Sequence, residues 1–198
     1  MPLFIRNEMK VPAQTAEIFK ILSKGQFINS NSPDKRIADL YRIIEEEQNF
    51  EKLYDYFLMI NFVLEKGNEY YYFSRPETKT DLEKKIEAAF KWIDIVDFLK
   101  TFRNDFGSGV RFSASDILVQ MKTDADLETK LEGLRKYADK NTHQEIIERI
   151  LKILADDSFI EMENPITQQY KVLASFNYLE QLILTINIPD EVKNEIPE

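Results

Sequence analysis

Apolar residues in the first part of the chain recur at the spacing of amphipathic helices. This spacing predicts helices over residues 15–24, 33–46 and 50–60. Gly25 ends the first of them, and Pro33 suits the start of the second, where its missing N–H costs no hydrogen bond. The second helix separates apolar from charged residues, so one face is expected to pack against a core while the other meets solvent.

A β-hairpin is predicted over residues 61–75, where two β-prone runs flank Gly67 and Asn68. Gly67 can take the positive φ that a tight two-residue turn requires, and Asn68 tolerates the left-handed region. The hairpin follows a helix directly, which is the order found at the end of a winged-helix unit.

The second half of the chain repeats this order after a long helix. Periodicity predicts one helix from residue 81 to about residue 102, and Gly107 and Gly109 predict a sharp turn after it. Three shorter helices follow, the first capped by Ser113 or Ser115. A second hairpin, with Pro165 in its connection, comes before a last helix. The first of the three helices is expected to run from residue 113 or 115 toward residue 122, and the other two over 126–137 and 142–154. The strands are expected at 159–163 and 169–173, and the last helix over 176–187.

The sequence therefore predicts a mainly α fold with small β-hairpins (α+β), arranged as tandem winged-helix domains joined by a long helix. The first domain is expected to span residues 1–106, including the long helix. The second is expected to span residues 107–198.

Composition narrows the functional classes. The chain has 198 residues, no cysteine and a formal net charge of −9, with the acidic excess mainly in residues 101–198. The lack of cysteine excludes disulfides and thiol chemistry and fits a reducing cytosolic compartment. No apolar run reaches the length of a membrane span, so a cytoplasmic protein is expected. The acidic balance excludes a uniformly basic surface, so any DNA contact must be a local patch.

Two groups of cations are candidates for such a patch. A winged-helix fold can present basic helix residues to phosphates, and binding of that kind is steeply salt-dependent and independent of sequence. The competing interpretation is that these residues form solvated helix faces or balance nearby carboxylates. The candidates are Lys35, Arg36 and Arg42 in the first domain, and Arg135, Lys136, Lys140, Arg149, Lys152 and Lys171 in the second.

Four consecutive aromatic residues on the return strand of the first hairpin are candidates for a partner contact. Alternation points Tyr70 and Tyr72 one way and Tyr71 and Phe73 the other, so both faces of the hairpin carry rings. Stacking on single-stranded bases is one use of such a run. Burial in a core or against a protein partner is the interpretation that the two-sided placement favours.

Catalytic and cofactor sites are not indicated. His143 is the only histidine and is expected to lie exposed in a first helical turn, so one chain cannot build a Ser-His pair or a multi-histidine metal site. The acidic pairs near helix ends are interpreted as solvated termini rather than metal ligands. The segment 107–109 lacks the Gly-Lys-Ser/Thr of a phosphate-binding loop. We therefore expect neither enzymatic activity nor a cofactor.

Several segments resemble the MukE/MksE family, the small non-SMC subunits of bacterial condensin-like complexes. They are residues 18–30, the Tyr-Asp-Tyr-Phe at 54–57, residues 67–75 with Tyr-Phe-Ser-Arg at their end, and Phe-Gly-Ser-Gly at 106–109. Residues 99–102 and 113–118 are similar to the MksE branch.

The resemblance implies a non-enzymatic homodimer of tandem winged-helix domains that binds a kleisin subunit, which in turn bridges an SMC-type ATPase. It implies a nucleoid-associated protein that takes part in chromosome organisation and segregation or in plasmid defence, with non-sequence-specific DNA held in the complex. The alternative is a free-standing winged-helix transcription regulator. A regulator should carry a markedly basic recognition helix, which neither domain clearly has.

Overall fold

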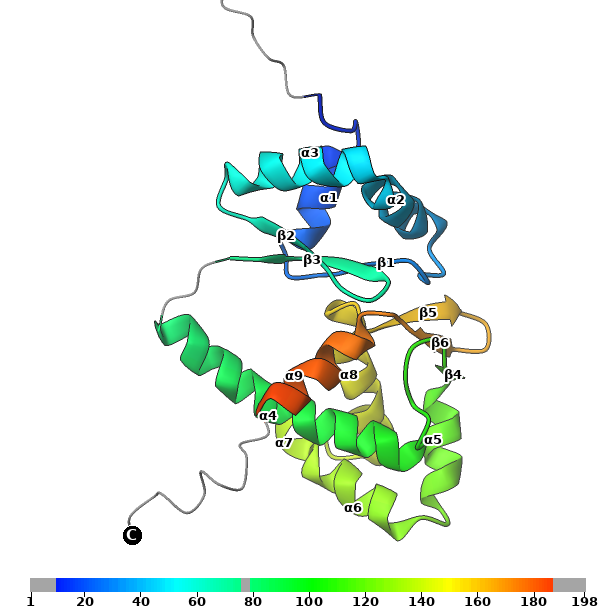
Figure 1. Ribbon diagram of the computed structural model, residues 1–198. Helices are drawn as coiled ribbons and strands as arrows, with labels where there is room; N and C mark the ends of the chain where they lie inside the picture. Colours follow the sequence, from blue (N-terminus) through cyan, green and yellow to red (C-terminus); the bar gives the residue numbers. More distant parts are fainter. Residues whose placement is uncertain (1–9, 76–78, 187–198) are drawn as a thin grey trace, which may run out of the picture. The chain divides into compact units, whose positions relative to one another are not determined.

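The structure is a computed structural model that describes residues 10–75 and 79–186, with side chains described outside residues 79–87 and 185–186. The chain divides into two compact units, Met1–Pro76 and Glu77–Glu198. Each unit combines helices with one small antiparallel sheet, so the protein is mainly α with small β elements (Figure 1). No helix within the described ranges is long and apolar enough to cross a membrane.

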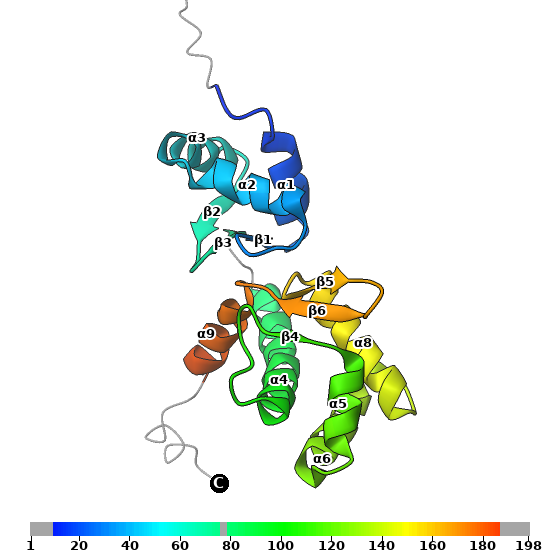
Figure 2. The same ribbon diagram turned by 90° about the vertical axis from the view of Figure 1, so that its right-hand side faces the viewer.

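The first unit places three helices on one side of a three-stranded sheet (Figures 1 and 2). The strands are antiparallel in the order β1-β3-β2, so the short first strand pairs with the return strand of the hairpin. The elements are α1 (Thr15–Leu22), β1 (Ile28–Asn29), α2 (Lys35–Glu45), α3 (Glu47–Leu58), β2 (Val63–Lys66) and β3 (Tyr70–Ser74).

The core of this unit forms where the predicted apolar stripes meet. Ile18 of α1, Ile44 of α2 and Phe57 of α3 are fully buried and belong to one cluster with Leu64 and Tyr71 of the sheet. Asp34 caps α2 by accepting a hydrogen bond from the backbone N–H of Arg36 (2.8 Å). The three helices predicted within residues 15–60 are therefore confirmed, although α2 begins at Lys35 after its cap Asp34 and not at the expected Pro33.

The second unit repeats the order of helix, strand, helix, helix and hairpin, with two extra helices inserted. Its sheet has the order β4-β6-β5, again with the short first strand against the return strand. The predicted helix over 126–137 is two helices, because the chain turns at Leu134. The elements are α4 (Lys79–Phe102), β4 (Arg111–Phe112), α5 (Ala114–Met121), α6 (Ala125–Gly133), α7 (Arg135–Ala138), α8 (His143–Asp156), β5 (Ile160–Asn164), β6 (Gln169–Val172) and α9 (Phe176–Ile186).

The long helix α4 packs within the second unit, so the unit boundary lies at residues 76–77 and not at the expected 106–107. Trp92 is buried against Phe159, with ring centroids 5.1 Å apart, and Lys130 of α6 pairs with Asp97 at 2.9 Å. Sequence periodicity found the helix but could not assign it to a unit, because its partners lie far along the chain.

The turn of the first hairpin differs from the predicted one. Residues 67–69 form a three-residue loop, and Glu69 rather than Gly67 takes the positive φ, at 64°. Gly67 is required for space: a Cβ at this position would lie 2.1 Å from Cζ of Tyr70, whose ring covers the turn. A glycine is therefore needed at position 67 because the Tyr70 ring leaves no room for a side chain, and not because the backbone is left-handed there.

Candidate nucleic-acid and partner interfaces

The predicted cations of α2 are mostly neutralised by neighbouring carboxylates. Arg36 pairs with Glu17 of α1, and this hydrogen bond raises the pKa of Arg36. Arg42 pairs with Asp39 one turn earlier on α2. Lys35 is exposed and has no ion-pair partner among the residues that the structure describes. Only one of the three positive charges is therefore uncompensated.

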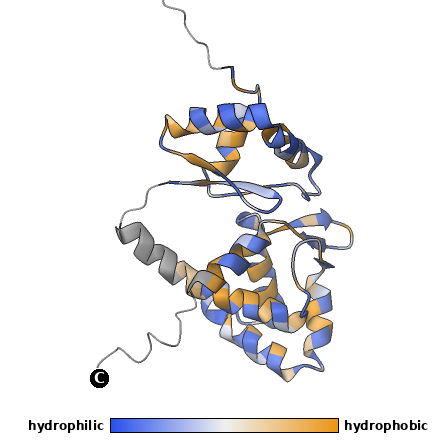
Figure 3. Ribbon diagram, viewed as in Figure 1, coloured by the Kyte–Doolittle hydropathy of each residue, from blue (hydrophilic) through white to orange (hydrophobic). Residues whose placement is uncertain are grey.

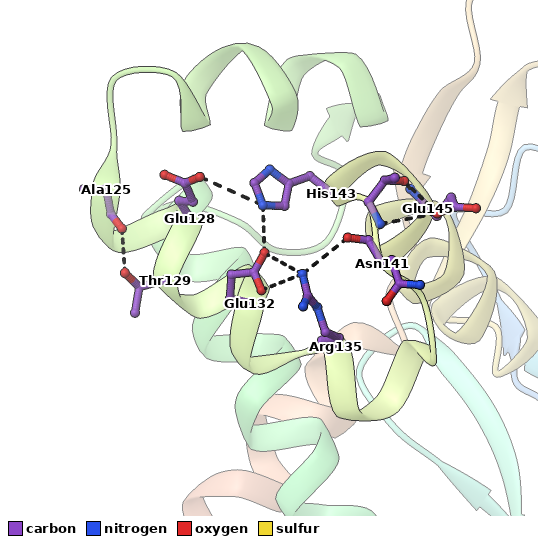
Figure 4. Close-up of polar contacts among 9 residues, drawn as sticks. Ala125, Glu128, Thr129, Glu132, Arg135, Asn141, His143 and Glu145 are labelled. Carbon is purple, nitrogen blue, oxygen red and sulfur yellow. Dashed lines mark hydrogen bonds and ion pairs between the residues drawn. The ribbon is translucent and has the colours of Figure 1, made fainter.

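A polar cluster joins α6, α7 and the start of α8 (Figure 4). Nε2 of His143 lies 2.8 Å from Oε1 of Glu132 and 3.9 Å from Oε1 of Glu128. Arg135 donates to the same Glu132 carboxylate and to the carbonyl of Asn141, at 3.2 and 3.3 Å. Half-buried His143 is thus a link between helices, not the freely exposed residue that was expected. Arg135 serves the same link through its Nη2 atom.

Lys136 ties the short helix α7 to α4. Its Nζ lies 2.8 Å from a carboxylate oxygen of Asp94, which also accepts a hydrogen bond from the Tyr137 hydroxyl (2.7 Å). Burial alone would raise the pKa of Asp94, but these two hydrogen bonds outweigh it and lower the pKa. Lys136 is therefore a structural cation of the second unit.

Among the predicted cations of the second unit, three lie at or beside the exposed face of α8. Lys140, Arg149 and Lys152 line a shallow hollow together with Glu145 and Glu148. Neither Lys140 nor Arg149 forms an ion pair with any described residue, whereas Lys152 binds both carboxylate oxygens of Asp156 at 2.9 Å. The hollow can therefore offer a lysine and an arginine to an anion without breaking an existing pair.

The two carboxylates beside this hollow accept hydrogen bonds from residues in the first turn of α8 and its cap. Glu145 closes a capping box with Thr142, and the hydrogen bonds that it accepts from Thr142 lower its pKa. Glu148 accepts a hydrogen bond from the side-chain amide of Gln144 (2.9 Å). Each carboxylate thus has a local donor that reduces its competition for the two cations.

The last predicted cation, Lys171, lies on the central strand β6. It stands opposite Arg111 of β4 and Glu161 of β5 and is half-buried. Arg111 forms a bidentate pair with Glu163 (2.5 and 2.8 Å), which raises the pKa of Arg111 and lowers that of Glu163. Lys171 therefore belongs to a mixed-charge sheet face rather than to the patch on α8.

The aromatic run of β3 is covered largely by its own unit. Tyr70 and Tyr71 are buried, and the ring of Phe73 packs against Phe57 at 4.8 Å. Tyr72 is half-buried beside Phe27, at 5.7 Å. Only parts of Tyr72 and Phe73 remain open to a partner.

Glu45 at the end of α2 fixes the hairpin to the helices. It accepts hydrogen bonds from Nζ of Lys66 (2.8 Å) and from the hydroxyl of Tyr71 (2.5 Å), and these lower its pKa. Burial first and the hydrogen bond to Glu45 second raise the pKa of Tyr71, and the same two causes raise that of Tyr41 to about 12. Glu45 is therefore a structural anchor of the hairpin, although its side chain remains exposed at the end of α2.

Comparison with protein families identifies the chain. The family described as condensin complex protein MksE matches residues 13–183. The chain belongs to the MksE family. The predicted resemblance to the MukE/MksE family is thereby confirmed. The comparison with curated proteins returned no match.

The structure separates the cations that the sequence grouped together in this MksE-family chain. Lys140, in the loop before α8, comes together with Arg149 and Lys152 of α8, whereas Arg135 and Lys136 pair with carboxylates of α6 and α4. These carboxylate partners are not deducible from the cations' own helix, because Asp94 and Lys136 lie 42 positions apart. No group of three or more possible metal-ligating residues occurs in the described part of the chain.

An exposed apolar surface on the MksE-family fold was not predicted. It occupies the end of α3 and the turn after it, where Leu58, Met59 and Ile60 lie exposed beside Tyr56. The helical pattern predicted the helix over residues 50–60, but it did not indicate that the apolar residues at its end are exposed. The signal that could have revealed this surface is the run of apolar residues on both sides of the helix at its end.

Proposed function

We propose that the chain is a non-enzymatic accessory subunit of a bacterial SMC–kleisin complex, which binds the kleisin and assists the entrapment of DNA. The single observation that carries the proposal is the match to the condensin complex protein MksE family over residues 13–183. The partners are a MukF/MksF-like kleisin, directly, and an SMC-type ATPase, through the kleisin. The process served is chromosome organisation and segregation or plasmid defence, at the nucleoid.

A tandem winged-helix architecture is part of this proposal. Each unit has a helix before its short first strand, further helices and then a hairpin, and each sheet pairs the first strand with the last. This order is that of a winged helix, in which the hairpin is the wing. Two such units in one chain support the architecture that the family resemblance implies.

We further propose that DNA contacts are phosphate contacts made by α8. The support is Lys140, in the loop before α8, and Arg149, on the exposed face of α8, neither of which forms an ion pair with a described residue. Because the chain is acidic and offers few positive charges, we expect it to bind DNA weakly and without reading the bases. We expect the assembled complex to bind DNA more strongly than the chain alone. Homodimerisation would double the number of such patches in one particle.

The proposed function is tested by the order of assembly. The chain, a kleisin and an SMC ATPase encoded beside it are purified separately and mixed in pairs. The proposal expects the chain to co-purify with the kleisin alone, and with the ATPase only when the kleisin is present. Failure to bind the kleisin, combined with tight binding to one operator sequence, would instead identify a free-standing transcription regulator.

A further inference from the structure

The exposed apolar surface of the first unit lies at the C-terminal end of α3. Tyr56, Leu58, Met59 and Ile60 have exposed fractions of 37%, 47%, 65% and 44%. In Figure 3 the hydrophobic colour continues from this end of α3 into the turn before β2. Four large apolar residues within five positions are thus exposed at this helix end, and their burial by a partner would be favourable. We call these four residues the α3 strip.

Acidic side chains continue this surface along the helix. Glu51, Asp55, Leu58 and Met59 follow one another at positions i, i+4, i+7 and i+8, so they share one helix face. Glu51 and Asp55 are exposed, and neither forms an ion pair with any residue that the structure describes. Lys52 is the one exposed cation on α3, so the exposed charges of the helix are mainly negative.

This charge pattern suits a protein partner better than DNA. In a DNA-reading winged helix, the helix before the wing enters the major groove, where carboxylates would meet phosphates. The corresponding helix of the second unit, α8, carries the hollow lined by Lys140 and Arg149 instead. The two helices before the hairpins therefore differ in charge: the α3 face carries carboxylates without ion-pair partners among the described residues, whereas the α8 hollow combines cations with Glu145 and Glu148.

We propose that the α3 strip, with Glu51 and Asp55, is the docking surface for a kleisin segment that carries apolar side chains followed within two helical turns by Lys or Arg. The inference rests on the proposed function, since it names the surface that binds the kleisin. Complementary charge selects such a segment and fixes its direction along α3. A second copy of the chain would offer this surface Glu51, Asp55 and the single cation Lys52, so it provides less charge complementarity than a segment rich in Lys or Arg.

Site-specific photo-cross-linking tests the surface directly. A photoreactive phenylalanine analogue replaces Met59 in one variant and Val119 in another, since the two native side chains are equally exposed, at 65% and 64%, but lie in different units. Each full-length variant is mixed with the purified kleisin and irradiated. The expected result is a kleisin adduct from position 59 and none from position 119.

Three outcomes would overturn the inference. If the kleisin co-purifies with the unmodified chain but forms no adduct at position 59, the docking surface is wrong while the proposed function stands. An adduct between two copies of the chain at position 59 would mean that the strip is a self-association surface. If the kleisin does not bind the unmodified chain, the proposed function fails and this inference fails with it.

Affinity measurements give an independent readout. The double variant E51K/D55K and the single variant M59Q are each expected to weaken kleisin binding by roughly tenfold, while V119Q leaves it unchanged. E51K/D55K should also reduce the salt dependence of binding, because the attraction between charges is lost. These exposed substitutions should preserve the fold, which circular dichroism verifies. Unchanged affinity in both α3 variants would refute the surface.

Discussion

Single residues hold the hairpin of the first unit in place, and Glu45 is the clearest case. Its carboxylate joins α2 to both hairpin strands through Lys66 and Tyr71. Substitution of Glu45 by Gln should lower the free energy of unfolding at neutral pH by about 1 kcal/mol, since the charge-assisted bonds are lost and the site is partly open to solvent. Hydrogen exchange of the β3 amides measures this loss of stability, because it reports on the first unit alone.

The pH dependence of the same interaction has a fixed sign. The folded-state pKa of Glu45 lies below its usual value, so its stabilisation is fully present above the unfolded-state pKa and is lost as the pH falls through the folded-state pKa. Glu45→Gln should remove this part of the acid destabilisation. An unchanged acid dependence of β3 exchange in the variant would contradict the assignment.

Gly67 and Gly133 form a matched pair of glycines with opposite expectations. Gly67→Ala should destabilise the first unit by roughly 1–3 kcal/mol, because the new methyl would displace the buried Tyr70 ring. Gly133→Ala in α6 meets no atom within 4 Å and should stabilise the second unit by about 0.5–1 kcal/mol. Thermal unfolding followed by circular dichroism measures both. A tolerated Gly67→Ala would mean that the turn is looser than the structure shows.

At the scale of elements, local signals located most helices and strands. Apolar spacing and the caps at Ser113 and Thr142 defined α5 and α8, because these signals lie within the element itself. What could not be predicted depends on partners far along the chain. The placement of α4 in the second unit and the pairing of Arg36 with Glu17 are of this kind. The use of Glu69 in the turn is a local feature, because the ring of Tyr70 lies over Gly67.

The capping box of α8 gives a prediction for one element. Thr142→Ala should lower the stability of the second unit by about 1 kcal/mol, because the Glu145 amide and the Glu145 carboxylate both lose a partner. Trp92 is the only tryptophan of the chain and packs on Phe159 in this unit, so its fluorescence during urea unfolding reports the change. Thr142→Ser should retain most of the stability. Equal losses in both variants would argue against the cap.

At the scale of the whole molecule, we propose that two groups of charged residues serve different partners. The cations without partners on α8 are proposed to meet DNA, and the carboxylates beside the α3 strip are proposed to meet the kleisin. On this proposal, the acidic net charge of the chain weakens its own affinity for DNA, so most of the affinity comes from the assembled complex. The sequence revealed the overall charge, but not which cations remain free, because this depends on contacts between helices.

DNA binding by the assembled complex distinguishes free from paired cations. The double variant K140Q/R149Q should weaken duplex binding and lower the slope of log affinity against log salt by roughly one for each phosphate that the protein no longer neutralises. R36Q/R42Q removes the same charge from residues that already have carboxylate partners and should change the slope little. Equal effects of the two double variants would show that overall charge, not the α8 patch, governs binding.

The most direct test of the central claim is the mass of the particle in solution. Size-exclusion chromatography with light scattering is run on the full chain at tens of micromolar, alone and with the purified kleisin. We expect a homodimer for the chain alone and one heavier particle of fixed stoichiometry when the kleisin is added. A strict monomer that elutes separately from the kleisin would contradict the claim.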